Sequence, residues 1–279
     1  MKRSSAVDPM VGYAIFYLVF LYGPVLLLPL FSLNNSIFIA FPLKGLTFQW
    51  YLQMAENDAL LHAIGNSLKV GVSASVVSTI LGILAAKAMT RYRLPGRGAV
   101  SGMILLPLVI PSIILGIALL VLVLNVFKIN PSLYTIVAGH VLICVPFAML
   151  VMMSRLEGFD KNLEEASADL GENGWQTFWR ITFPLAMPGI VASLLLCFTT
   201  SFDEFLLAFF LAGNEATLPL FIFSQLRLPT QLPSVLALGS CILVVSFVVV
   251  FLSERMRRIG IQKKPTASAE PAWAPTPTP

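Results

Sequence analysis

The sequence predicts an all-α integral membrane protein with six transmembrane helices and both termini in the cytoplasm. Three observations predict it: the composition, six long apolar stretches and an uneven distribution of basic residues. Of the 279 residues, 57% are hydrophobic and only 11% are charged, and the mean hydropathy is +0.85. Soluble domains carry about 25% charged residues, so this composition indicates a protein that lies in a bilayer.

A helix needs about 20 consecutive apolar residues to cross a bilayer. Six stretches meet this requirement: 11–33, 66–88, 99–124, 133–154, 189–212 and 234–253. Pro107 and Pro111 interrupt the third stretch, which we expect to remain one kinked span because neighbouring helices can satisfy the freed backbone groups. The first stretch is too long for a signal peptide and lacks a clear small-residue cleavage site, so we expect it to be retained.

The basic residues gather on one side of the predicted spans. Fourteen of the 18 Lys and Arg residues lie at the two termini or beside the segments that follow the second and fourth spans. By the positive-inside rule, that side is cytoplasmic. Because the basic residues sit at span ends and not on one face, the net charge of +4 does not indicate nucleic-acid binding.

The chain is expected to form one membrane domain, residues 11–264. A short cytoplasmic N-terminus at 1–10 precedes it, and a Pro- and Ala-rich tail at 265–279, expected to be disordered, follows it. The largest external loop, 34–65, is expected to cover the membrane domain as a lid, with a short surface helix at 46–63; docking of an external protein is the alternative.

One charged segment stands out between the fourth and fifth spans. Residues 157–188 read EGFDKNLEEASADLGENGWQTFWRITFPLAMP and carry six acidic and two basic side chains, so they must project into water. An amphipathic helix is indicated by the helical spacing of its less polar residues. That stripe consists of Leu163, Ala166, Ser167 and Leu170.

Two glycines are expected to end this helix. Gly171 and Gly174 break it, and a second short helix follows with Trp175 and Trp179 on one side. We expect Pro184 and Pro188 to close the segment before the fifth span. A soluble helix–glycine–helix arrangement in a membrane protein is typical of a docking surface.

The segment resembles a motif of the permease subunits of binding-protein-dependent ABC importers. That motif is Glu-Ala-Ala, three residues, Gly, nine residues and Ile-x-Leu-Pro. This chain has Glu165-Ala166-Ser167, then Gly171, then Ile181-Thr182-Phe183-Pro184 at the same spacing. Ser167 and Phe183 depart from the pattern. The resemblance implies a type I ABC importer permease architecture in a bacterial inner membrane.

The resemblance also implies partners and functional residues. The chain would pair with a second, homologous permease, two ATPase subunits would dock on the cytoplasmic side, and an extracytoplasmic solute-binding protein would deliver the cargo. The helix at 161–171 would be the coupling helix. Its implied ATPase-coupling residues are Leu163, Glu164, Glu165, Ala166, Ser167, Asp169, Leu170 and Gly171.

Among those residues, Glu165 would make polar contacts or cap a helix, and Gly171 would permit the turn. A solvated helix face is the alternative for Glu165. Further along, Ser201-Phe202-Asp203-Glu204 and Leu218-Pro219 resemble the polyamine (spermidine/putrescine) branch of these permeases. Related branches transport other small solutes, including opines, amino-acid derivatives and iron.

The fifth span contains the only acidic residues placed deep in the membrane. Asp203 lies about 20 Å along this span from Ile190 at 1.5 Å per residue, and a charge facing lipid there costs at least about 2.5–3.5 kcal/mol. A continuous helix would place Thr200, Ser201, Asp203 and Glu204 on one arc. We interpret this arc as a translocation path for cations. The alternatives are a carboxylate paired with a basic residue of the second subunit, or a hydrogen-bonded packing site.

Other chemistries lack the residues that they need. No Gly-Lys dipeptide occurs, so no P-loop nucleotide site is expected and ATP hydrolysis would belong to a separate subunit. His62 and His140 are far apart and there is no Cys-x-x-Cys, so we expect no metal site, no cofactor and no enzyme activity. His140 is expected to pack or hydrogen-bond. An ion-coupled secondary transporter, with Asp203 and Glu204 as a relay, is the rival function.

Overall fold

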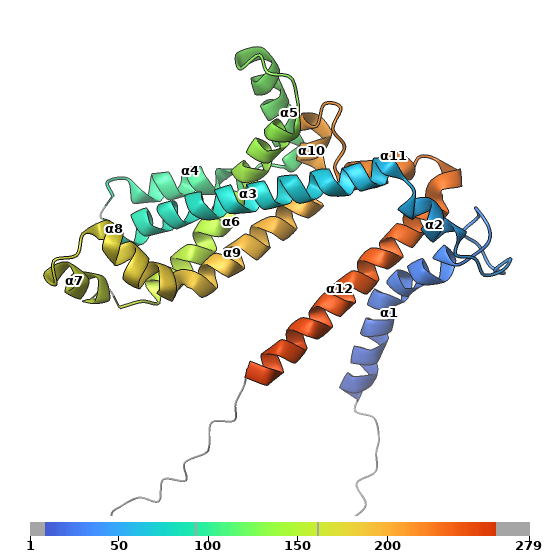
Figure 1. Cartoon of the computed structure of the whole chain (residues 1–279), viewed down its shortest axis with the longest axis horizontal. Coiled ribbons are helices and arrows are strands. Elements are labelled where there is room, and N and C mark those ends of the chain that lie inside the picture. Colours follow the sequence, from blue (N-terminus) through green and yellow to red (C-terminus); the bar gives the residue numbers. More distant parts are fainter. Residues whose placement is uncertain (1–8, 93, 161, 261–279) are drawn as a thin grey trace, which may run out of the picture. The chain divides into compact units, whose positions relative to one another are not determined.

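The computed structural model describes residues 9–92, 94–160 and 162–260, and these residues are nearly all helical (Figure 1). The predicted tail at 265–279 and most of the predicted N-terminus lie outside them. The helices are α1 (Pro9–Ser32), α2 (Gln49–Ala55), α3 (Asp58–Arg91), α4 (Arg97–Val109), α5 (Ser112–Val121), α6 (Leu133–Glu157), α7 (Asn162–Asp169), α8 (Gly174–Thr177), α9 (Phe183–Asp203), α10 (Leu206–Leu211), α11 (Leu218–Gln225) and α12 (Leu232–Gly260).

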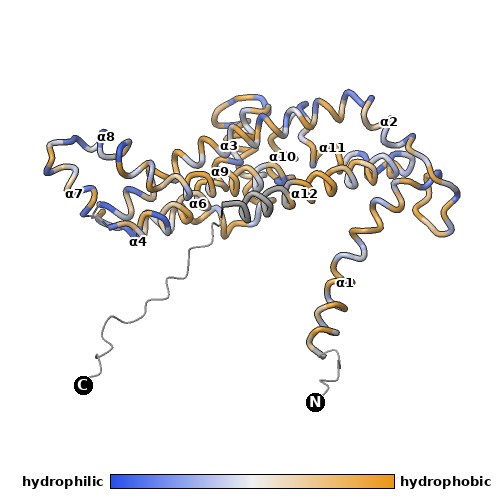
Figure 2. Tube along the Cα trace, turned by 60° about the horizontal axis from the view of Figure 1, so that its bottom comes forward, coloured by the Kyte–Doolittle hydropathy of each residue, from blue (hydrophilic) through white to orange (hydrophobic). Residues whose placement is uncertain are grey.

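Five helical stretches of the described residues are long and apolar enough to cross a membrane, and the total is six if the bent pair of α4 and α5 counts as one span. This agrees with the all-α, six-span prediction. Figure 2 shows α1 as apolar along most of its length, whereas the α7–α8 segment is hydrophilic. The chain divides into two compact units: residues 1–50 with 236–279, and residues 51–235.

In the first unit, the loop after α1 folds around Asn34. The side-chain oxygen Oδ1 of Asn34 accepts a hydrogen bond from the Lys44 backbone N–H at 2.9 Å. The backbone carbonyl oxygen of Asn34 accepts a second one from Trp50 Nε1 at 2.9 Å. Asn34 also forms an isolated bridge with Leu46. The buried polar groups of the loop are therefore satisfied within the loop itself. The single surface helix expected at 46–63 is not present: residues 49–55 form α2, and residues 58–63 belong to the start of α3.

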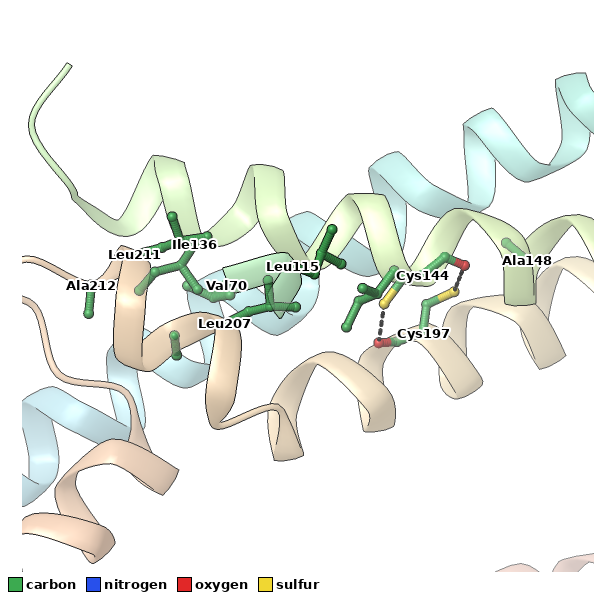
Figure 3. Packing of buried hydrophobic residues seen from close by; sticks show 11 residues of the cluster. Val70, Leu115, Ile136, Cys144, Ala148, Cys197, Leu207, Leu211 and Ala212 are labelled. Atoms are coloured by element: carbon green, nitrogen blue, oxygen red, sulfur yellow. Dashed lines mark hydrogen bonds between the residues drawn. The ribbon is translucent and has the colours of Figure 1, made fainter. Parts of the chain in front are cut away.

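The core of the second unit is formed by α3, α6 and α9, which pack against one another. Small residues permit the close approach: a Cβ added to Gly82 of α3 would lie 2.5 Å from the Ala148 Cβ of α6. Small residues at helix crossings are typical of membrane proteins because they let backbones come together. A cluster of buried apolar side chains from α3, α5, α6, α9 and α10 fills this core (Figure 3).

The third predicted span is not one kinked helix. It consists of α4 and α5, which meet at an angle of 103°. Ile110 is extended, with φ −78° and ψ 128°, as expected for a residue that precedes proline. Pro107 lies inside α4 without ending it, so Pro111 marks the break.

The fifth predicted span also differs from expectation at both ends. Helical structure runs from Gly174 to Asp203, through a π-helical segment, η2 (Phe178–Thr182). Pro184 and Pro188 therefore do not close the charged segment, because both lie within this continuous helical run. Pro184, which has no N–H to continue the backbone hydrogen bonds, follows the end of η2 by two residues. At the other end, the helix stops at Asp203, and Glu204 is extended before α10 begins.

Candidate coupling and transport sites

The predicted helix–glycine–helix arrangement is present in the charged segment 157–188. Gly171 follows α7 with φ +88°, a left-handed conformation that glycine adopts without the strain imposed on other residues. Asn173 then caps α8, because its side chain accepts hydrogen bonds from the N–H groups of Trp175 at 3.1 Å and Gln176 at 2.9 Å. The Asn173-to-Gln176 spacing is a capping-box signal that the sequence analysis did not use.

The predicted apolar stripe of α7 divides into two parts. Leu163 and Ala166 are exposed, and Leu170 is 86% exposed. Ser167 is buried, with its hydroxyl 3.0 Å from Thr177 Oγ1. We call Leu163, Ala166 and Leu170 the outer face of α7. Asp169 is also exposed.

The two adjacent glutamates of α7 have different surroundings. Glu164 is partly buried: its Oε2 lies 3.2 Å from Arg91 Nε, and its Oε1 accepts a hydrogen bond from Thr182 Oγ1 at 2.7 Å. Glu165 is exposed and lines the rim of a hollow of ≈ 320 Å³ beside Arg91 and Lys87. The family motif points to Glu165 and predicts no separate role for Glu164. In the structure, Glu164 is the one of the two that contacts other helical elements.

The predicted substrate-path residues do not form one arc. Asp203 is exposed at the last position of α9, and Thr200 is half-buried. Ser201 is buried and faces α6, where its hydroxyl lies 2.7 Å from His140 Nδ1. Glu204 lies beyond the helix, so the projection of a continuous helix was wrong for Glu204, whereas Ser201 lies within α9 as predicted.

Glu204 instead starts the next helix. Its Oε1 accepts hydrogen bonds from the N–H groups of Leu206 at 2.9 Å and Leu207 at 3.1 Å, which are first-turn donors of α10 without helical partners. Asp203 forms no salt bridge within the part of the chain that the structure describes. Of Asp203 and Glu204, Asp203 is therefore the carboxylate available to pair with a positive charge.

Buried polar contacts join α6 to α9 in the turns that precede Asp203. His140 is 1% exposed and bonds Ser201, as expected for a hydrogen-bonding histidine. One turn further, Cys144 and Cys197 exchange thiol-to-carbonyl contacts at 3.6 and 3.5 Å (Figure 3). These contacts hold one face of α9 against α6, and Asp203 lies on another face of α9, where it is exposed.

The amino-acid sequence matches a known family over residues 78–258, the binding-protein-dependent transport system inner membrane component. It is 35% identical over 248 residues to the spermidine/putrescine transport system permease protein PotC of Escherichia coli strain K12, covering 88% of this chain and 93% of that protein. It is 34% identical over 254 residues to the putrescine transport system permease protein PotI of the same strain, covering 87% and 90%.

Solved structures share the fold at lower sequence identity. A chain of a bacterial ABC transporter involved in the import of the acidic polysaccharide alginate matches with a TM-score of 0.70 and 18% identity, covering 90% of this chain and 97% of that chain. A chain of the MetNI methionine ABC transporter in an inward-facing conformation matches with a TM-score of 0.54 and 16% identity, covering 77% and 99%.

Proposed function

Because the chain belongs to the family of binding-protein-dependent transport system inner membrane components and is an ABC importer permease, not an enzyme, we propose that its cargo is a polyamine. The observation that carries this proposal is the exposed Asp203 carboxylate at the end of α9. The two polyamine permeases similar to this chain support the same cargo.

The end of α9 favours a cation for two electrostatic reasons. The last turn of a helix carries unpaired carbonyl oxygens and a partial negative charge, so a carboxylate there is disfavoured unless a cation is near. Asp203 adds a full negative charge at this position, next to the hydroxyl of the half-buried Thr200. A protonated amine satisfies both groups, whereas an anionic cargo does not.

The exposed outer face of α7 supports the proposed docking of an ATPase. The outer face of α7 exposes two leucines and an alanine beside acidic residues, a surface suited to a groove on an ATPase subunit. Two ATPase copies dock below this chain and a second homologous permease, and an extracytoplasmic binding protein delivers the cargo. Closure of the ATPase dimer moves α7 and opens the path to alternate sides of the membrane.

Asp203→Asn tests the role of the carboxylate, because it keeps the shape of the side chain and removes its charge. In proteoliposomes that contain the complete transporter, we expect spermidine uptake to fall by about tenfold or more, the effect of losing roughly 1.4 kcal/mol of charge interaction. Glu56→Gln is the matched control, because Glu56 is an exposed carboxylate between α2 and α3.

The assembly of the complex separates the two interpretations of Asp203. Co-purification of the second permease and the ATPase with the Asp203→Asn chain is expected to be unchanged. Loss of assembly instead supports a carboxylate paired with the second permease. Unchanged uptake with intact assembly contradicts the proposed path.

The cargo and the energy source need separate measurements. Unlabelled putrescine is expected to compete with labelled spermidine, whereas an opine, an amino-acid derivative or an iron complex is not. A Walker-lysine variant of the ATPase is expected to abolish uptake. Uptake that survives this variant and collapses with the proton gradient supports the ion-coupled alternative.

A further inference from the structure

We propose that Arg91 and Glu164 form the linkage through which movement of α7 reaches the membrane helices. This inference rests on the proposed docking of an ATPase on the outer face of α7. It assigns positioning roles to two residues that touch neither nucleotide nor cargo. Glu164 lies on α7 outside the proposed docking surface, and Arg91 lies at the end of α3, where the two side chains are in contact.

Arg91 joins three helices at once. It is the last residue of α3, and its side chain is only 7% exposed. Its Nε lies 3.2 Å from Glu164 Oε2 of α7, and its Nη2 donates a hydrogen bond to the carbonyl oxygen of Leu156 at 3.2 Å, near the end of α6. The guanidinium thus donates a hydrogen bond through Nη2 and forms an ion pair through Nε, which has no hydrogen-bond partner among the described residues. Its planar, delocalised charge reaches both groups at once, whereas a lysine ammonium is a single point charge.

Glu164 extends the linkage to a fourth element. Its second carboxylate oxygen accepts the hydrogen bond from Thr182 at 2.7 Å. Thr182 is buried and is the last residue of η2, directly before α9. The two oxygens of one carboxylate are therefore held by α3 and by the start of α9. Since α3, α6 and α9 form the core of their unit, a displacement of Glu164 acts on all three helices.

The linkage is polar because α7 is not closely packed against α3. The hollow of ≈ 320 Å³ lies between the last two turns of α3 and the α7–α8 segment, lined by Lys87, Arg91, Glu164 and Glu165. The other side-chain hydrogen bonds of α7 in the described residues, from Ser167 to Glu172 and Thr177, stay within the cytoplasmic segment. Thr177, however, lies in the helical run that continues into α9, and Lys87 of α3 lies over the Phe178 ring at 5.2 Å. The Arg91–Glu164–Thr182 contacts differ from these because they reach α3, α6 and α9 through one guanidinium and one carboxylate.

A second ion pair on the same side provides a matched control. Arg97, at the start of α4, lies 4.0 Å from Glu157, at the end of α6, and these side chains are 52% and 58% exposed. The pair has the same chemistry, but it is solvated and does not contact α7. Exposed pairs of this kind contribute little, whereas removing one partner of a buried pair leaves an uncompensated charge.

The test compares these pairs in the complete transporter, reconstituted with its ATPase, second permease and binding protein. Three quantities are measured: co-purification of the ATPase, ATP hydrolysis and cargo uptake. We expect Arg91→Gln and Glu164→Gln to keep the ATPase bound and hydrolysing ATP, while uptake per ATP falls by about tenfold, the effect of losing one charge-assisted contact. Arg97→Gln is expected to leave uptake per ATP unchanged.

Milder variants keep the inference testable if the glutamine variants fail to fold. Arg91→Lys retains the charge but loses the planar guanidinium group. Thr182→Val removes only the hydrogen bond between Glu164 and the residue directly before α9. Both are expected to lower uptake per ATP by roughly threefold, because each leaves part of the linkage in place. The double exchange Arg91→Glu with Glu164→Arg is expected to recover part of the loss seen in the single variants.

Each contrary outcome has a definite meaning. Unchanged uptake per ATP in Arg91→Gln and Arg91→Lys overturns the linkage. Loss of the ATPase from Arg91→Gln or Glu164→Gln also overturns it, because the pair then serves docking and not transmission. If the unmodified chain does not retain an ATPase, the proposed docking fails, and this result is distinguishable from a failure of the linkage alone.

Discussion

The α7–α8 segment and the α9–α10 junction each contain two adjacent acidic residues, and in both regions the two neighbours have different surroundings. In α7, Glu164 is held by Arg91 and Thr182, whereas Glu165 is exposed. At the junction, Glu204 caps α10, whereas Asp203 is exposed. One acid of each pair holds the fold, and the other is available to a partner or a cargo.

The difference between the regions lies in what surrounds the held acid. Glu164 meets a guanidinium and a hydroxyl from other helices, so it connects distant parts of the chain. Among the described residues, Glu204 accepts hydrogen bonds only from backbone N–H groups two and three residues ahead, so it stabilises only the start of α10. We therefore expect a graded series of effects when these residues and their neighbours are changed.

The largest effect is expected on the outer face of α7. Changing Leu163 and Leu170 together to Ser removes the apolar contact proposed for the ATPase, at about 1.5 kcal/mol or more for each buried leucine. Affinity for the ATPase should therefore fall by roughly a hundredfold, measured by titration of the purified permease pair. Changing Leu226 and Leu228 together to Ser serves as the control, because these two leucines are each 51% exposed but lie outside α7. Unchanged affinity in the Leu163 and Leu170 variant contradicts docking at this face.

Glu164→Ala should have the next largest effect, on the local stability of α7. Loss of the carboxylate leaves Arg91 buried beside the Leu156 carbonyl with its charge uncompensated, at a cost of about 3 kcal/mol, the lower end for a buried pair. Hydrogen exchange of the α7 amides is expected to accelerate by about two orders of magnitude or more. Equal exchange in Glu164→Ala and Glu165→Ala would show that the two glutamates are equivalent.

Glu204→Ala is expected to cost about 1 kcal/mol, the usual contribution of a helix cap. The transition temperature of the detergent-solubilised chain should fall slightly, and exchange should increase in α10 but not in α7. Glu204→Asp keeps a capping carboxylate and is expected to lose less. A larger loss in the conservative variant contradicts the capping role.

The smallest effects on stability are expected for the two exposed acids. Glu165→Ala and Asp203→Asn should each change the free energy of unfolding by no more than about 0.5 kcal/mol, as is usual for surface positions. A denaturation series on the purified chain measures this. A loss of more than about 2 kcal/mol in either variant places that acid among the residues that hold the fold.

The positions of the spans and of the cytoplasmic segment were predictable because apolar length and charge decide them locally. The break between α4 and α5 had a visible signal in Pro111, but the 103° angle depends on packing around the break. The end of α9 had no such signal, since neither Gly nor Pro lies near Glu204; the side chain of Glu204 itself caps the next helix. A projection of one continuous helix therefore misplaced Glu204, while the contact of Ser201 with His140 depends on how α9 packs against α6.

The roles of the two α7 glutamates were not separable by spacing alone. The motif drew attention to Glu165 because its position matches the family pattern. Glu164 acquires its role from Arg91, which lies far away in the sequence at the end of α3. Only the packing of α3 beside α6 and α9 brings that guanidinium to α7, and no local pattern contains this information.

The central claim is that a negative charge at position 203, in contact with water, attracts the cargo. The most direct measurement changes Asp203 to Cys in a Cys241→Ser background, where Cys144 and Cys197 remain buried. Uptake of labelled spermidine is then followed before and after treatment with an anionic or a cationic methanethiosulfonate reagent. We predict that the cysteine variant loses uptake and that only the anionic reagent restores it. Failure of position 203 to react, or recovery with either charge, would contradict the account.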